Sequence, residues 1–306
     1  MREGHIREMG AMMAKVNDAL HRKYDPIFKD ASPLEELGRV VKVAPLAVEE
    51  LKTLGTLAGV DGSNVRAGGA HPHYIELFQG LAKVITGEEL TVQDLFTPIL
   101  DGGTGDEGSE SRRRLAAVEL KAALKALESW ELSILIMDGG LLRYKIDCEE
   151  LWEPLRERAL ERGVLLVGAI KDIKTHMIAE ARGLKNHYYD KDYLVGRLRQ
   201  GEAFFPKDEV NPKVAEGLVS AFYRPSRHPD VVGMDVLIQQ RDQMELLMGL
   251  LLSLTPANSR GVPYWMDIVD SACKVHPQTL QLLMEEHLDR SYMERFFVSE
   301  RDRRSL

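Results

Sequence analysis

Two apolar stretches of the sequence each end in an aspartate that is followed by glycine. They are LAGVDGS, which contains Asp61, and ILIMDGG, which contains Asp138. Taken alone, Asp-Gly-Ser is a turn signal, so Asp61 has an ordinary structural interpretation. An aspartate at the carboxyl end of a buried strand, however, lies where open α/β sheets bind ligands, and the glycine after it permits close approach. The repetition favours a functional pair.

Two further acids lie on predicted helices. Glu119 is inside the helix before the second of these strands, near the boundary of its apolar stripe. The ordinary interpretation is a solvated glutamate paired with Lys121 or Lys125. Asp270 lies close to the apolar stripe of PYWMDIVDSACKV, and Asp267 lies one turn earlier. A carboxylate favoured by the dipole at a helix start describes Asp267 better than Asp270.

Converging carboxylates are what phosphodiester hydrolysis by two divalent ions requires. The ions lie about 3.5–4 Å apart; one lowers the pKa of the attacking water and the other stabilises the leaving oxygen. Carboxylate and water ligands suit Mg²⁺ or Mn²⁺. We hypothesise that Asp61 bridges two such ions and that Glu119, Asp138 and Asp270 complete their ligand shells.

The elements that must position these acids follow from the hydrophobic periodicity. We expect helices over 1–24, 111–130 and 148–163, a helical segment over 32–54 that Pro45 interrupts, and strands over 56–61, 131–138 and 164–172. Segment 62–70 is expected to be a turn, and segment 73–86 is expected to form one or two strands, with a helix as the alternative. The alternation of strands and helices favours an α/β sheet with parallel members.

The remaining segments are less regular. The Gly-, Asp- and Glu-rich stretch 101–110 is expected to be a flexible loop. Region 174–220 is expected to be mostly helical, 220–238 a pair of strands around a polar turn, and 241–254 an apolar helix. A last helix is expected from 264 to 275. No linker divides the pattern, so one elaborated domain is favoured over two.

Composition excludes several classes of protein. The 306 residues are 44% hydrophobic and carry a net charge of −8, which argues against a protein that coats nucleic acid by bulk positive charge. Two cysteines support neither a disulfide framework nor a cysteine zinc site. No apolar run is long enough for a membrane span, and a cytoplasmic location is expected. Local basic strips remain at 112–114, 171–174 and 301–304.

In order and spacing, these motifs resemble those of NurA-domain nucleases over about residues 55–276. The matching segments are Val60–Ser63, the Arg-rich helix start Arg112–Leu120 with Glu119 inside it, Met137–Leu142, Val167–Lys171, Asp192–Glu202 and Gly261–Lys274. The last helix differs from many members, because Asp270 stands where they carry a histidine. Aspartate is also a hard oxygen ligand, so metal binding should survive, although Asp267 remains the alternative ligand.

The resemblance implies an RNase H-like mixed sheet flanked by helices, with an N-terminal helical extension and helical insertions. Residues 1–54 would form the extension, 55–280 the nuclease domain and 281–306 a C-terminal helix with a basic tail. The implied activity is 5′-to-3′ exonuclease and single-strand endonuclease action on DNA with Mn²⁺ or Mg²⁺, two ions per site. The implied partners are a second copy of the chain and a HerA-type hexameric ATPase, in end resection, repair or phage defence.

Other residues have weaker assignments. Lys171 would contact the scissile phosphate or orient water, or is simply a lysine at a strand end. Tyr264 would stack on a base or, more commonly for such a residue, pack its own helix. Candidate phosphate contacts are Arg66, Arg112, Arg113 and Lys174. The apolar stripe containing Met9, Met12 and Met13 is interpreted as an interface with a dimer mate or the translocase. His71 and His73 are interpreted as surface-turn residues.

Two other functions remain open. Sugar kinases and actin-like ATPases also place Asp-Gly turns at two strand ends. They would need a second, related half with its own Gly-rich adenosine turn, and the chain after the Asp138-Gly-Gly turn contains no such Gly-Gly motif. A catalytically inactive DNA-positioning adaptor for the translocase is the third interpretation, and the presence of all four acids argues against it.

Overall fold

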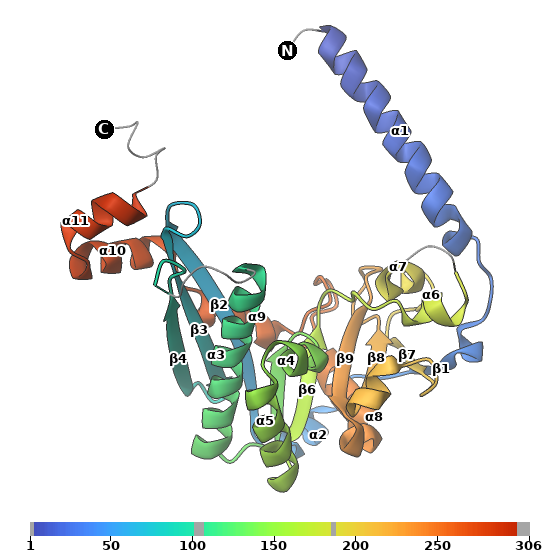
Figure 1. The fold of residues 1–306 in the computed structure, drawn as a ribbon. Coiled ribbons are helices and arrows are strands. Elements are labelled where there is room, and N and C mark those ends of the chain that lie inside the picture. Colours follow the sequence, from blue (N-terminus) through green and yellow to red (C-terminus); the bar gives the residue numbers. More distant parts are fainter. Residues whose placement is uncertain (1–2, 101–106, 185–187, 299–306) are drawn as a thin grey trace.

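A mixed β-sheet organises the chain (Figure 1). The computed structural model describes residues 3–100, 107–184 and 188–298. Within these residues the sheet has nine strands in the order β1-β7-β8-β9-β6-β5-β2-β3-β4. Their bounds are β1 Gly38–Lys42, β2 Leu57–Gly68, β3 Tyr74–Val84, β4 Glu89–Phe96, β5 Ile134–Asp138, β6 Leu165–Ile170, β7 Glu202–Pro206, β8 Leu218–Tyr223 and β9 Val232–Leu237.

Helices cover both faces of the sheet. The α-helices are α1 Glu3–Phe28, α2 Val48–Thr53, α3 Glu107–Ser129, α4 Leu141–Asp147, α5 Glu149–Glu161, α6 Met177–Ala181, α7 Asp190–Leu194, α8 Met244–Ser253, α9 Tyr264–Cys273, α10 Pro277–His287 and α11 Arg290–Tyr292. Short 3₁₀ turns lie at Leu34–Glu36, Pro212–Glu216 and Ile238–Gln243, and a π turn at Met293–Phe297. Within the described part of the chain, no helix has both the length and the apolar composition needed to cross a membrane.

The alternation of buried side chains along the strands makes two separate cores. Ala58 and Val60 of β2 pack with α3, α4 and α5 on one face. Leu57 and the β5 residues Ile134 and Ile136 pack with α8 and α9 on the other face. Because residues i and i+2 of a strand share a face, Asp61 and Asp138 belong to the face that α9 covers. Glu119 comes from α3, on the opposite face.

The described residues correct three sequence predictions. Segment 32–54 is α-helical only after Pro45, because Gly38–Lys42 is an edge strand that pairs antiparallel with β7. Region 174–220 is not mostly helical, since it contains β7 and the start of β8. The edge strand β1 has no buried residue, and the three central residues of β7 are all buried, so neither strand shows a period-2 pattern in the sequence. Residues 101–106 of the expected loop lie outside the described residues, and α3 already begins at Glu107.

The third correction concerns Asp61, which does not end a strand. β2 continues through the expected turn to Gly68 and pairs with β3 along that whole length. Its parallel pairing with β5, in contrast, stops at Val60, which lies opposite Met137. Asp61 and Asp138 are therefore neighbours at the carboxyl edge of the parallel strands, as an α/β site requires, although β2 itself runs on.

Paired glycines let α3 approach the sheet closely at this level. Gly62 of β2 lies opposite Gly80 of β3. A Cβ on Gly80 would lie 2.2 Å from the carbonyl oxygen of Val118, and a Cβ on Gly62 would lie 2.3 Å from Oε1 of Glu119. On the other face, a Cβ on Gly59 would lie 2.9 Å from Val269 of α9. Missing side chains on both faces of β2 thus set how closely the two acid-bearing helices pack.

We expect Gly80→Ala to lower the free energy of unfolding by about 2 kcal/mol or more, because the new methyl group meets helix backbone that cannot rotate away. Urea denaturation measures this change. Gly10→Ala in α1 is the matched control: none of the described atoms lies near its Cβ position, so it should be neutral or slightly stabilising. Equal stability of wild type and Gly80→Ala would contradict the close packing.

Candidate active site

Asp61 is the most buried of the acids on the α9 face, with 4% of its surface exposed. Its Oδ1 accepts a hydrogen bond from the backbone N–H of Gly62 at 2.7 Å. Its Oδ2 is buried and has no hydrogen-bond partner among the described residues. A buried carboxylate oxygen without a partner is costly in a folded protein, and coordination of a cation removes that cost. Asp61 therefore has a free oxygen that a cation would satisfy.

Glu119 is buried, not solvated as its place on the helix suggested. Only 1% of its surface is exposed, and neither Lys121 nor Lys125 is its partner in a described ion pair. Its Oε2 accepts a short hydrogen bond from Nη2 of Arg143, a residue of α4. Because Gly62 and Gly80 have no side chains, the α3 backbone lies so close to the sheet that the Glu119 carboxylate lies against β2.

Asp138 is the last residue of β5, and Lys171 follows β6 directly. The Nζ of Lys171 lies 3.0 Å from Oδ1 of Asp138. The backbone carbonyl of Asp138 accepts hydrogen bonds from the Tyr144 hydroxyl at 3.1 Å and from Arg143 at 3.4 Å. Residues 143 and 144 therefore tie the end of β5 to the helix that follows it.

The charges of the acids act on one another. Burial, and after it the charges of Asp138 and Glu119, raise the pKa of Asp61 to about 8. Burial also raises the pKa of Glu119 to about 7, although the Arg143 guanidinium acts in the opposite direction. These raised values show that the site disfavours its own negative charge. A bound cation would relieve that repulsion.

Asp270 and Asp267 both lie on α9, and each pairs with a cationic side chain, Lys274 and Arg260 respectively. Burial, followed by the charges of Asp61, Glu119 and Asp270, raises the pKa of the Cys273 thiol to about 12. That thiol donates a hydrogen bond to the backbone carbonyl of Asp61 at 3.3 Å, so α9 is attached to β2 beside the acids. Asp267 pairs with Arg260 at 2.6 Å.

A buried ion pair behind the site was not predicted from the sequence. Nζ of Lys213 lies 2.7 Å from Oδ1 of Asp235, and both residues are buried. Oδ2 of Asp235 accepts a hydrogen bond from the N–H of Leu141 at 3.1 Å. It therefore holds the first turn of α4, the helix that carries Arg143. Nothing in the sequence around Arg143 or Asp235 indicated either role, because the partners are distant along the chain.

The residues present suit divalent cations in their chemistry. Carboxylates are hard oxygen donors, and Asp61 offers a free oxygen. Among the described residues, no three His, Cys, Asp or Glu side chains already surround a single point as a ligand set. Three of the acids instead pair with cationic side chains: Glu119 with Arg143, Asp138 with Lys171 and Asp270 with Lys274.

The predicted DNA contacts are spread over different surfaces. Arg66 is engaged with Glu76 and Glu107 and stacks on Tyr74, near the far end of the β2–β3 hairpin. Arg113 pairs with Glu110 and Glu150, and Arg112 lies 3.9 Å from Asp147, so these arginines are already neutralised. Lys174 is exposed, and Tyr264 is 60% exposed at the start of α9. Exposure favours the stacking role of Tyr264 over packing.

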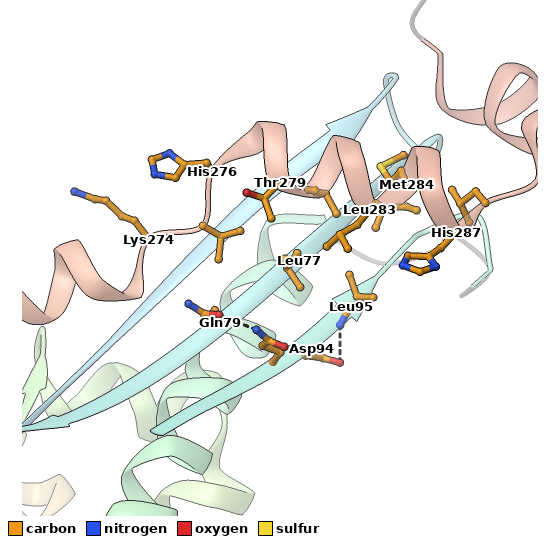
Figure 2. A pocket seen from close by; sticks show the side chains of 15 residues that line it. Leu77, Gln79, Asp94, Leu95, Lys274, His276, Thr279, Leu283, Met284 and His287 are labelled. Carbon is orange, nitrogen blue, oxygen red and sulfur yellow. Dashed lines mark hydrogen bonds between the residues drawn. The ribbon is translucent and has the colours of Figure 1, made fainter. Parts of the chain in front are cut away.

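The side chains of α10, β3 and β4 line a groove, and none of the four predicted ligand acids is part of its lining (Figure 2). It has a volume of about 720 Å³ and lies between α10 and the strands β3 and β4. Lys274 lies at one end, where it also pairs with Asp270 at 2.7 Å, and His287 lies at the other. Leu77, Leu95 and Leu283 make the lining largely apolar.

The histidines of the turn region are not at the site. His71 is exposed and lies 3.6 Å from Glu107, and His73 stacks on Phe296. The basic strip 301–304 lies outside the described residues.

Comparison with known proteins gives one family match. A family model described as the NurA domain matches residues 55–275. No curated protein matches the chain. The mixed sheet flanked by helices, expected from the sequence, is confirmed in the described residues.

Several solved structures are distantly similar. The catalytic domain of human Endonuclease V is 12% identical, covering 90% of this chain and 99% of that one, with a TM-score of 0.41. Endonuclease V of Ciona intestinalis, in complex with an inosine-containing DNA, is 10% identical, with coverages of 90% and 99% and a TM-score of 0.35. Drosophila Piwi is 10% identical, covering 71% of this chain and 29% of that one, with a TM-score of 0.33.

With a chelator present, we expect stability to decrease as pH rises. Folded Asp61 keeps its proton up to about pH 8, whereas the unfolded side chain loses it near 3.8. The folded state therefore binds more protons between these values, so the free energy of unfolding falls through this window, by a few kcal/mol at about 1.4 kcal/mol per pKa unit. Urea denaturation at a series of pH values in EDTA measures the decrease.

Asp61→Asn is the control for this pH dependence. It removes one of the two shifted groups, so the decrease should become shallower and leave mainly the contribution of Glu119. The same slope in the variant and the wild type would show that Asp61 is not the group responsible.

Proposed function

The chain belongs to the NurA domain family, and from this premise we propose that it is a metal-dependent DNA nuclease that hydrolyses phosphodiester bonds. The observation that carries the proposal is Asp61, whose buried Oδ2 has no partner among the described residues and whose pKa is raised by burial and by the charges of Asp138 and Glu119. The carboxyl edge of the parallel strands, where Asp61 and Asp138 lie, is the place at which open α/β sheets bind their ligands.

Asp61, Glu119, Asp138 and Asp270 would hold the ions, two per site, with Mn²⁺ or Mg²⁺ as the metal. When bound, the metal lowers the pKa of the attacking water and stabilises the leaving oxygen. The chain's own contribution is to keep the carboxylates at fixed positions. The close approach of α3 at Gly62 and Gly80 fixes Glu119, and the hydrogen bonds at the end of β5 fix Asp138.

Lys171 is the proposed phosphate contact. Its ammonium group lies at the carboxyl edge of the parallel strands and pairs with Asp138 at 3.0 Å, with about a quarter of its side chain exposed. A flexible lysine stem can turn from the carboxylate toward a phosphate that enters the site, or orient water beside it. Tyr264 and Lys174 extend the proposed DNA contact through stacking and backbone charge, neither of which reads the sequence.

The finer activities rest on the family. We propose 5′-to-3′ exonuclease and single-strand endonuclease action, in partnership with a HerA-type hexameric ATPase, in end resection, repair or phage defence. We also propose a homodimer. Helix α1 supports an interaction role, because it extends away from the sheet (Figure 1) and Met9, Met12 and Met13 are each more than half exposed.

Cleavage of DNA is the direct test. Purified chain is incubated with linear duplex and single-stranded DNA in Mn²⁺, in Mg²⁺ and in EDTA. We expect metal-dependent degradation that Asp61→Asn reduces by on the order of a hundredfold or more, because outer-shell partners alone cost 10–100-fold. Asp208→Asn is the matched control, since Asp208 is an exposed carboxylate paired with Arg241 on another part of the surface.

The other outcomes separate the alternatives. Intact DNA together with ATP turnover would favour a phosphotransferase of the actin-like or sugar-kinase type. Neither activity would leave an inactive adaptor that positions DNA for the translocase. A comparison of Asp270→Asn with Asp267→Asn identifies the fourth acid: the former should lose cleavage and the latter should retain it.

We expect replacement of Met9 and Met13 by serine to weaken association of the chain with its partners, since both side chains expose apolar surface on α1. Light scattering during gel filtration reports the dimer, and co-elution reports binding of a HerA-type ATPase. Leu282→Ser is the matched control, because Leu282 is equally exposed but lies on α10. A wild-type monomer that ignores the ATPase would contradict both associations.

A further inference from the structure

We propose that Arg143 is a fixed internal counter-cation of the acid cluster. It neutralises Glu119 while no metal is bound, and it makes metal binding weaker than the acids alone would allow. This inference rests on the proposed function, because it concerns the affinity of the same site for a divalent cation. It assigns to Arg143 a role in setting that affinity, in addition to positioning Glu119.

The position of Arg143 is defined by three acceptors around one nitrogen, which share its two N–H groups. Nη2 donates to Oε2 of Glu119, to the hydroxyl of Tyr144 at 3.0 Å and to the backbone carbonyl of Asp138 at 3.4 Å. The guanidinium carbon also lies 4.5 Å from the centre of the Tyr144 ring. These contacts connect α3, α4 and the end of β5, so the guanidinium cannot leave without breaking several of them.

Arg143 occupies one oxygen of Glu119 and leaves the other toward β2. Oε2 is the atom that the guanidinium contacts, whereas Oε1 is the atom nearest the Cβ position of Gly62. The carboxylate is therefore oriented with its second oxygen beside the strand that carries Asp61. A cation bound there by Asp61 and Glu119 would have the positive charge of Arg143 as a close neighbour.

The other two cations of the cluster differ from Arg143 in mobility. Lys171 and Lys274 each hold a carboxylate by a single contact at the end of a flexible stem, and Lys274 is 58% exposed. They can turn into solvent when a divalent ion arrives. Arg143 is held by Tyr144 and by backbone, so its charge remains and repels the ion.

Without Arg143, Glu119 would be a buried carboxylate with no cationic partner described for it. Breaking a buried ion pair by removing one partner is strongly destabilising. A divalent ion would restore the missing positive charge, so loss of Arg143 should make the metal-free protein less stable and metal binding tighter. A residue that only positioned Glu119 would show the opposite effect on binding, because its loss would disorder a ligand.

The test is calorimetric titration of the full chain with Mn²⁺ alone, together with thermal unfolding in Mn²⁺ and in EDTA. We expect Arg143→Gln to unfold at lower temperature in EDTA, to gain more from Mn²⁺ than the wild type, and to bind Mn²⁺ at least about fivefold more tightly. Arg241→Gln is the matched control, since Arg241 pairs with Asp208 away from the acids, and its affinity should equal that of the wild type.

Arg143→Lys keeps the positive charge but places it on a flexible stem that can turn away from an arriving ion, as those of Lys171 and Lys274 can, so its Mn²⁺ affinity should fall between those of the wild type and Arg143→Gln. If Arg143→Gln does not fold without metal, this variant decides alone. Mn²⁺ affinity that is unchanged or weaker in the folded variants would overturn the inference while leaving the nuclease proposal intact. A wild-type chain that binds no Mn²⁺ and leaves DNA intact would overturn both.

Discussion

The close approach of α3 to β2 and β3 is the constraint on which the rest of the site depends. Gly62 and Gly80 face each other across the two strands, and α3 occupies the space where their side chains would lie. This contact buries the Glu119 carboxylate against the strand that carries Asp61. A side chain at either glycine would meet α3 and hold the helix, and with it Glu119, farther from the sheet.

Burying these acids together creates an electrostatic problem that the fold solves in part. Arg143, Lys171 and Lys274 each neutralise one carboxylate, while Asp61 has only the N–H of Gly62 among the described residues. The incomplete compensation raises the pKa of Asp61, mainly through burial and next through its acidic neighbours. A site that is short of positive charge, yet built from fixed hard oxygens, is suited to binding a divalent ion.

Much of the fold near the site could be predicted from the sequence, because the strands there are long apolar runs and the helices are strongly periodic. Strands β5 and β6 and helices α3, α5 and α9 lie close to their predicted positions. The strands farthest from the site were predicted poorly. β1 lies at the sheet edge and pairs only with β7, which is distant in sequence, and β7 pairs with β1 and β8, so neither strand is defined by a local pattern. β2 was predicted too short, since Gly-Ser and Ala-Gly-Gly are turn signals that pairing with β3 overrides.

The sequence by itself determined which residues could be ligands and where two of them stand. Asp61 and Asp138 follow apolar runs that can be recognised locally as strands, and the parallel pairing of these strands brings the two acids to one edge. Only the tertiary structure decided that Glu119 is buried and that Arg143 is its partner. Each of these results depends on the rotation and separation of packed helices. Helix packing is set by contacts between distant residues, such as Gly80 and Val118, and no local pattern encodes it.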